Sequence, residues 1–98
     1  MCGINGLFSS STLLNKSLVR KMNDAINHRG PDNSNVEAFD GLALGHVRLA
    51  IIDLSEHANQ PFCDEECVLV YNGEIYNFEE LRLKYGFNLI ENILCINL

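Results

Sequence analysis

The chain has 98 residues, which corresponds to one small domain with a thin hydrophobic core. Hydrophobic residues make up 47% and charged residues 20%, which excludes a disordered or collagen-like chain. The formal net charge is −6 and the densest basic stretch is Arg20-Lys21, so nucleic acid is not an expected partner. No run approaches the ~20 apolar residues of a membrane span, and the N-terminus lacks the features of a secretory signal. We therefore expect no membrane partner and a cytoplasmic location.

A first helix is expected over about 14–27. Apolar residues recur there every four positions and place an apolar stripe on one face of the helix. Residues 9–12 supply N-cap candidates, and Gly30-Pro31 ends the segment. The stripe consists of Leu14, Leu18, Met22 and Ile26.

Most other regular segments are predicted to be strands joined by tight turns. Asp40-Gly41 and Asn72-Gly73 are turn signals, because these residues tolerate the left-handed backbone conformation. The expected strands and strand-like apolar runs are 2–8, 36–39, 42–47, 49–54 and 68–71.

A second, short helix is expected from Asn77 to about Tyr85. Glu80 follows Asn77 by three residues, as in a capping box, and Gly86 is a stop signal. Sparse helices and hairpin-linked strands predict an α+β fold with antiparallel sheet. Residues 87–98 are apolar with interspersed Asn, and their period distinguishes neither helix nor strand.

Cys2 is the first candidate for chemistry. A free Cys is usually a small buried hydrophobe, and on this feature alone that interpretation stays open. The small second side chain permits removal of Met1, however, which would give Cys2 a free α-amine with an unperturbed pKa of roughly 7.7–8.0. A thiol nucleophile and its base would then belong to a single residue.

Two further positions carry groups suited to binding an oxyanion or a carboxylate. A turn at a strand end can present the Asn72 amide and the Gly73 N–H to one point, as an oxyanion hole does. Arg48, in an apolar run, can bind a carboxylate with two hydrogen bonds, although a solvent-facing strand Arg is the simpler alternative. The segment His28–Asp32 is adequately explained by a basic helix end followed by a Gly-Pro stop.

The remaining His and Cys residues are expected to be structural. His46 and His57 have no partner base or metal ligand at a recognisable spacing. In a reducing compartment the four Cys are thiols rather than a disulfide framework. Cys63 and Cys67 could form half of a zinc site, but a second Cys/His pair is missing and Cys95 alone cannot complete it. We expect a surface loop there and no metal.

Several segments together form a pattern that is more specific than any one of them. They are Met-Cys-Gly-Ile at 1–4, His-Arg-Gly-Pro-Asp at 28–32, Gly-His-Val-Arg-Leu-Ala-Ile-Ile-Asp-Leu-Ser at 45–55, Gln-Pro at 60–61 and Tyr-Asn-Gly-Glu-Ile-Tyr-Asn-Phe at 71–78. In this order the segments resemble the class II glutamine amidotransferase domain of glutamine-hydrolysing asparagine synthetases. The resemblance implies an N-terminal nucleophile hydrolase fold over 1–98, with two antiparallel sheets packed face to face and helices outside.

The resemblance also implies roles for individual residues. Cys2, freed of Met1, would attack the side-chain amide of glutamine, and Asn72 with Gly73 would stabilise the oxyanion. Ammonia would leave, and water would hydrolyse the thioester to glutamate. Arg48 would hold the α-carboxylate and Glu74 the α-ammonium. The implied substrate-side positions are Arg48, Leu49, Ala50, Ile51, Ile52, Asn72, Gly73 and Glu74.

Two departures from the family pattern stand out. Residues 86–98 diverge and contain no Asp, whereas the family has an Asp there that also binds the substrate amine. We also expect the synthetase domain, with its Ser-Gly-Gly-type pyrophosphate loop, to be absent from this chain. We therefore expect no cofactor in this chain, with ATP and Mg bound only by an absent synthetase domain or subunit.

Two hypotheses of function remain. The first is the N-terminal part of a glutaminase that supplies ammonia for ATP-dependent asparagine synthesis from aspartate. The alternative is a truncated non-catalytic remnant or binding module of the same fold, as from a truncated or frame-shifted gene. For residues 1–98 alone we expect poor stability, because sheet edges would be uncovered, and little or no glutaminase activity.

Overall fold

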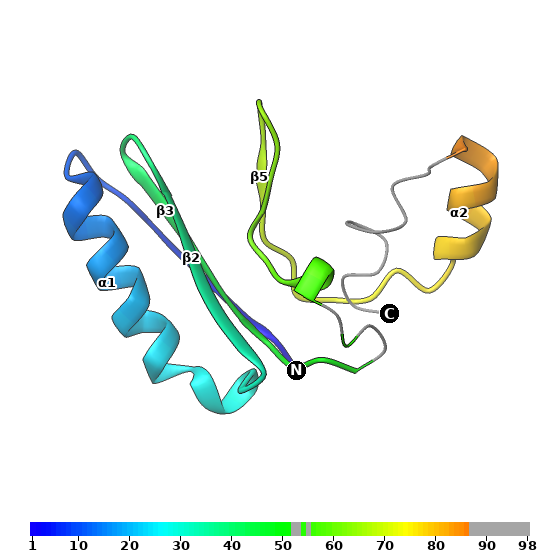
Figure 1. Ribbon diagram of the computed structural model, residues 1–98, viewed down its shortest axis with the longest axis horizontal. Helices are drawn as coiled ribbons and strands as arrows, with labels where there is room; N and C mark the ends of the chain where they lie inside the picture. The colour runs from blue at the N-terminus through cyan, green and yellow to red at the C-terminus, as the bar shows by residue number, and fades with distance from the viewer. Residues whose placement is uncertain (52–53, 55, 87–98) are drawn as a thin grey trace.

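The computed structural model describes residues 1–51, 54 and 56–86, and its regular part is a sheet with one helix packed against it (Figure 1). The elements are β1 (Gly3–Phe8), α1 (Thr12–Ala25), the 3-10 turn η1 (Asn27–Arg29), β2 (Asn33–Phe39), β3 (Leu42–Arg48), the 3-10 turn η2 (Glu56–Ala58), β4 (Phe62–Cys63), β5 (Val68–Leu69) and α2 (Phe78–Tyr85). The expected α+β class with antiparallel sheets is confirmed.

Strand β3 is the centre of a three-stranded antiparallel sheet in the order β1–β3–β2. β2 and β3 form the expected hairpin, with Phe39 opposite Leu42 and Asp40-Gly41 as the two-residue turn. Gly41 has a φ of +78°, a conformation that a side chain would strain. On the other side of β3, β1 pairs from Gly3 opposite Val47 onward. The start of β1 therefore lies beside the end of β3.

Helix α1 covers one face of this sheet but not with the predicted stripe. The predicted N-cap region is confirmed, because the Ser11 side chain accepts a hydrogen bond from the Leu14 N–H. The first three stripe residues are wrong as a buried face, because their side chains are 37–53% exposed. The buried residues are instead Asn15, Val19 and Asn23.

The close approach of α1 to β3 explains which helix face is buried. A Cβ on Gly45 would lie 2.6 Å from the Val19 side chain and 2.5 Å from Asn23 Oδ1. Asn23 donates to Ser34 Oγ and to the Asn35 carbonyl, so its amide is satisfied inside the interface. Asparagine hydrogen bonds and one valine therefore fix the helix, rather than the leucine periodicity that predicted it.

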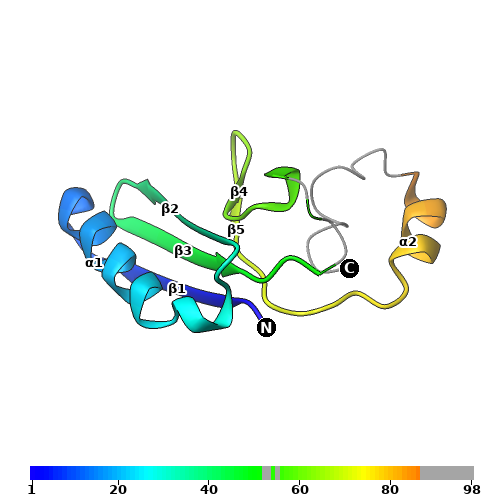
Figure 2. The same cartoon turned by 60° about the horizontal axis from the view of Figure 1, so that its bottom comes forward.

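The segment after β3 turns to the other side of the sheet, where β4 and β5 pair as a short antiparallel hairpin (Figure 2). The Asp64 carboxylate closes its turn by accepting from the Glu66 and Cys67 N–H groups. The strand expected over 68–71 is shorter, because β5 has only two residues. The apolar run 49–54 forms no strand in its described part, residues 49–51 and 54.

Helix α2 lies apart from the sheet, as Figure 1 shows, and it has no buried residue. Gly86, with a φ of +65°, ends it as expected. The predicted capping box is wrong: Asn77 is the N-cap residue, but its side chain makes no capping hydrogen bond. Residues 87–98 lie outside the described part, which contains no helix long and apolar enough to cross a membrane.

Candidate active site

Cys2 lies directly before β1, next to the end of β3, and is 5% exposed. Leu49, the first residue after β3, directs its N–H toward Cys2 Sγ at 3.4 Å. The sulfur lies 3.8 Å from the Leu49 carbonyl oxygen. Arg29 Nε donates to the Cys2 carbonyl at 3.1 Å, so the backbone of Cys2 is also held. The thiol therefore has a defined position beside the residues that follow β3.

Arg48 is the last residue of β3 and is buried, with 4% of its surface exposed. Its Nη1 donates to Asn59 Oδ1 at 2.9 Å, which orients the guanidinium. Arg48 thus directly precedes Leu49, whose N–H points toward Cys2 Sγ. Sequence reasoning missed Asn59, because an Asn in a loop carries no signal of the strand residue that it will contact.

The segment 28–32 does more than end a helix. A Cβ on Gly30 would lie 2.4–2.5 Å from backbone atoms of Val47 and Arg48, so only glycine permits this approach. Asp32 then donates its N–H to the Arg48 carbonyl at 3.0 Å and accepts from the Ala50 N–H at 2.8 Å. The interpretation as a simple basic turn was incomplete. The informative signal was Gly30, at a position where no side chain fits.

Asn72 and Gly73 are half-buried, but they do not form the predicted left-handed turn. The described residues with positive φ are only Gly41 and Gly86. A Cβ on Gly73 would lie 2.6 Å from the Tyr71 hydroxyl oxygen, so a side chain at this position would displace the Tyr71 phenol. Tyr71, which precedes this segment, is held to the rest of the molecule by hydrogen bonds.

Tyr71 links Asn72 to the sheet. Its carbonyl accepts from Gln60 Nε2 at 3.1 Å and lies 3.3 Å from His46 Nε2. Burial lowers the pKa of His46 to about 4, with the positive charge of Arg48 acting in the same direction and the Tyr71 carbonyl opposing it. His46 is therefore neutral near pH 7. The expectation that His46 is structural agrees with this position, while its link to the Asn72 segment could not be read from the sequence.

The other predicted substrate-side residues have different environments. Leu49 and Ala50 are half-buried, whereas Ile51 is 66% exposed. The Glu74 side chain is exposed on the segment between β5 and α2. Ile52 lies outside the described residues.

Cys63 and Cys67, on the β4–β5 hairpin, are exposed. Partial burial and the charges of Glu37 and Asp64 raise the pKa of Cys63. Within residues 1–51, 54 and 56–86, no three His, Cys, Asp or Glu side chains are grouped so that they could hold a metal ion.

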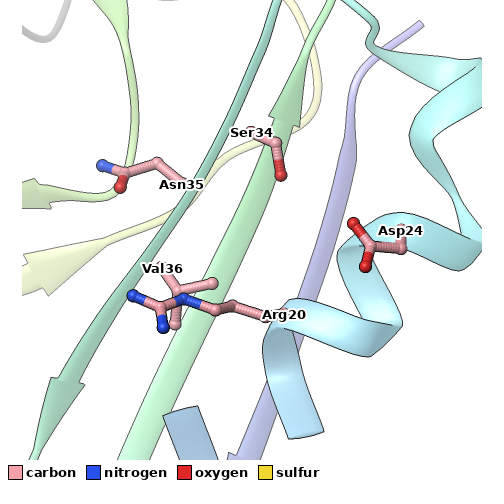
Figure 3. A pocket seen from close by; sticks show the side chains of 5 residues that line it. All are labelled: Arg20, Asp24, Ser34, Asn35 and Val36. Atoms are coloured by element: carbon pink, nitrogen blue, oxygen red, sulfur yellow. The ribbon is translucent and has the colours of Figure 1, made fainter. Parts of the chain in front are cut away.

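A cavity of about 320 Å³ lies between α1 and the edge strand β2, away from Cys2 (Figure 3). Arg20 extends from the helix across Val36, and Asp24 lies one turn further along. The lining residues are Arg20, Asp24, Ser34, Asn35 and Val36, none of which is a predicted site residue. The cavity therefore does not include the predicted catalytic and substrate-binding residues.

Comparison with known proteins identifies the family of the chain. A family model described as a glutamine amidotransferase domain matches residues 1–90. The chain belongs to this glutamine amidotransferase family.

Three relatives illustrate the similarity. A putative glutamine-hydrolysing asparagine synthetase 2 of Methanocaldococcus jannaschii is 42% identical over 88% of this chain and 21% of its own length.

Asparagine synthetase B of Escherichia coli is 41% identical over 88% of this chain and 16% of its own length. Amidase chry2 of Gibberella zeae is 39% identical over 97% of this chain and 17% of its own length. This amidotransferase chain thus spans about a fifth or less of the relatives that it matches. The resemblance to asparagine synthetases seen in the sequence motifs is confirmed.

Proposed function

We propose that this chain carries the nucleophile and part of the substrate pocket of a glutaminase. The observation that supports this most directly is the position of Cys2 Sγ beside the Leu49 N–H, next to the buried Arg48. A glutamine whose α-carboxylate is bound by Arg48 would be anchored next to the thiol. An N-terminal nucleophile hydrolase fold, of which the described sheet would form one part, belongs to this proposal.

The proposed reaction has two steps. Cys2 Sγ, with its proton taken up by its own α-amine, attacks the δ-carbon of glutamine, and the oxyanion accepts hydrogen bonds from the Asn72 amide and the Gly73 N–H. The C–N bond breaks, the ammonium group of Cys2 returns the proton, and ammonia leaves. Water then hydrolyses the γ-glutamyl thioester to glutamate and regenerates the thiol. Arg48 and Glu74 would hold the α-carboxylate and α-ammonium throughout.

The α-amine becomes available only when Met1 is removed. Met1 is 72% exposed, so a processing enzyme can reach it. The names of the Methanocaldococcus jannaschii and Escherichia coli relatives describe glutamine-hydrolysing asparagine synthetases. We extend the proposal accordingly: the ammonia supplies ATP-dependent synthesis of asparagine from aspartate, with ATP and Mg bound by a synthetase domain or subunit and the protein in the cytoplasm.

The test is glutamine hydrolysis by the chain with Cys2 as its first residue, alone and with the synthetase part of the Methanocaldococcus jannaschii relative added. We expect little or no release of ammonia and glutamate by the chain alone, and measurable release of both in the mixture. Cys2→Ala should abolish both products while the circular dichroism spectrum stays unchanged. Equal rates for Cys2→Ala and the parent chain would refute the proposal, and no hydrolysis in either condition would favour a non-catalytic module.

A further inference from the structure

The Gln60 carboxamide pairs with the backbone of Tyr71 in the manner of a neighbouring strand. Gln60 Oε1 accepts from the Tyr71 N–H at 2.5 Å, and Gln60 Nε2 donates to the Tyr71 carbonyl at 3.1 Å. The Gln60 side chain is fully buried, and burying an amide is costly unless it is hydrogen-bonded. Tyr71 lies just after the short strand β5. The Gln60 side chain therefore satisfies the N–H and the carbonyl of Tyr71, as a paired strand would.

His46 connects the same carbonyl to the central strand of the sheet. A carbonyl oxygen only accepts, so the Nε2 atom that lies 3.3 Å away must carry the ring proton. The buried Nδ1 is then the unprotonated nitrogen, and it has no hydrogen-bond partner among the described residues. The ring thus makes one directed bond, from β3 to Tyr71.

This arrangement links the two halves of the proposed site. Successive strand residues alternate between faces, so His46 and Arg48 point to the same side of β3. Arg48 is the proposed carboxylate anchor, and Leu49 next to it contacts the thiol of Cys2. Tyr71, held by His46, is covalently joined to the proposed oxyanion donors that follow it.

We propose that Gln60 and His46 are positioning residues that fix the Tyr71 peptide and so hold Asn72 and Gly73 in place relative to Cys2. This inference rests on the proposed function. Oxyanion donors act only when they are preorganised, and a displacement of about 1 Å can cost about 100-fold in rate. Neither side chain has to contact the substrate for this effect.

The first experiment measures kcat and KM for glutamine hydrolysis under the more active of the two conditions described above. Gln60→Ala, which loses both bonds, should lower kcat by about 30–100-fold with KM changed less than about 3-fold, because the proposed anchors remain. His46→Phe should lower kcat by about 10-fold. His46→Gln supplies a new amide donor at this position and should recover most of that loss.

Asn15→Ala is the matched control for lost stability. Asn15 is fully buried and donates to the Ser9 carbonyl, but it lies on α1, on the opposite face of the sheet. This variant should be less stable than the parent, while kcat and KM per folded molecule stay within about 2-fold, as expected away from a site. Activity is normalised to the folded fraction in every variant.

The second measurement does not depend on turnover. Hydrogen exchange of the Tyr71 amide should be slow in the parent chain, fast in Gln60→Ala and unchanged in Asn15→Ala. The inference is overturned if this amide exchanges equally in all three, or if Gln60→Ala and His46→Phe keep the kcat of the Asn15→Ala control while Cys2→Ala is inactive. If Cys2→Ala is as active as the parent, the proposed function fails as well.

Discussion

The two halves of the described chain hold their backbones in place by different means. In the first half, residues 3–48, strands of six and seven residues pair in continuous register and a helix covers one face. In the second half, residues 49–86, the two paired strands have two residues each. Polar side chains there bind backbone N–H groups that a longer strand would otherwise pair. The Gln60 side chain accepts from the Tyr71 N–H, and the Asp64 side chain accepts from the Cys67 N–H.

The comparison shows where a single substitution can disturb the candidate site. A strand residue is held by many backbone bonds, so loss of one side chain changes its position little. In the second half, a few side chains hold each segment, as Gln60 and His46 hold Tyr71, so the loss of one removes a large share of the contact. The candidate site takes residues from both halves: Arg48 comes from β3 in the first half, and Asn72 comes from the second half. The following predictions test this contrast.

The largest effect is expected at Gly30, which packs against the end of β3 within the first half. In Gly30→Ala the new Cβ would meet the backbone of Val47 and Arg48 at about 2.5 Å, and backbone cannot move aside as a side-chain end can. We expect the free energy of unfolding to fall by about 3 kcal/mol. The hydrogen bond from the Ala50 N–H to the Asp32 carboxylate should also be lost. Denaturant titration measures the fall in the free energy of unfolding.

Gly86→Ala is the matched control, because Gly86 has a positive φ but no neighbour within 4 Å. It should cost only about 1 kcal/mol, from local strain at the end of α2. Equal losses in the two variants would mean that close packing at Gly30 is not what holds the segment 28–32 against the end of β3.

The next largest effect on stability concerns the charge of His46, which links β3 to Tyr71 in the second half. The pKa of His46 is lowered from 6.5 to about 4 in the folded chain. Between these values the unfolded chain binds a proton that the folded chain does not, so the free energy of unfolding falls as the pH falls from about 6.5 to about 4. The full loss corresponds to about 3 kcal/mol.

Denaturant titrations of the parent and of His46→Phe at pH 7, 5.5 and 4.5 separate this effect from the titration of carboxylates. The variant should lose less stability than the parent over this range. Identical pH dependence in both chains would contradict the assignment of a buried neutral imidazole to this position.

A smaller effect distinguishes the two faces of α1 inside the first half. Val19 is fully buried against the sheet, and Val19→Ala should lower the free energy of unfolding by about 2 kcal/mol. Leu14, a member of the predicted stripe, is 53% exposed, and Leu14→Ala should cost less than about 0.5 kcal/mol. Thermal unfolding followed by circular dichroism checks both, and a larger loss for Leu14→Ala would restore the predicted stripe as the buried face.

Local sequence determined the features that depend on a few adjacent residues. The Asp40-Gly41 hairpin and the glycine end of α2 follow from backbone conformations that glycine alone adopts without strain. The start of α1 follows from the hydroxyl of Ser11, which lies within hydrogen-bond reach of a helix N–H three residues on. The family motifs likewise identified Cys2 and Arg48 as candidates without any coordinates.

Tertiary structure decided the features that depend on residues far apart in the chain. The contact of Cys2 with Leu49 spans 47 positions, and that of Arg29 with Cys2 spans 27. The buried face of α1 was set by its approach to Gly45, and the position of the Tyr71 backbone by the bonds that Gln60 and His46 make to it. Turn and helix propensities act over a few residues, whereas these hydrogen bonds form only when the sheet has brought both partners together.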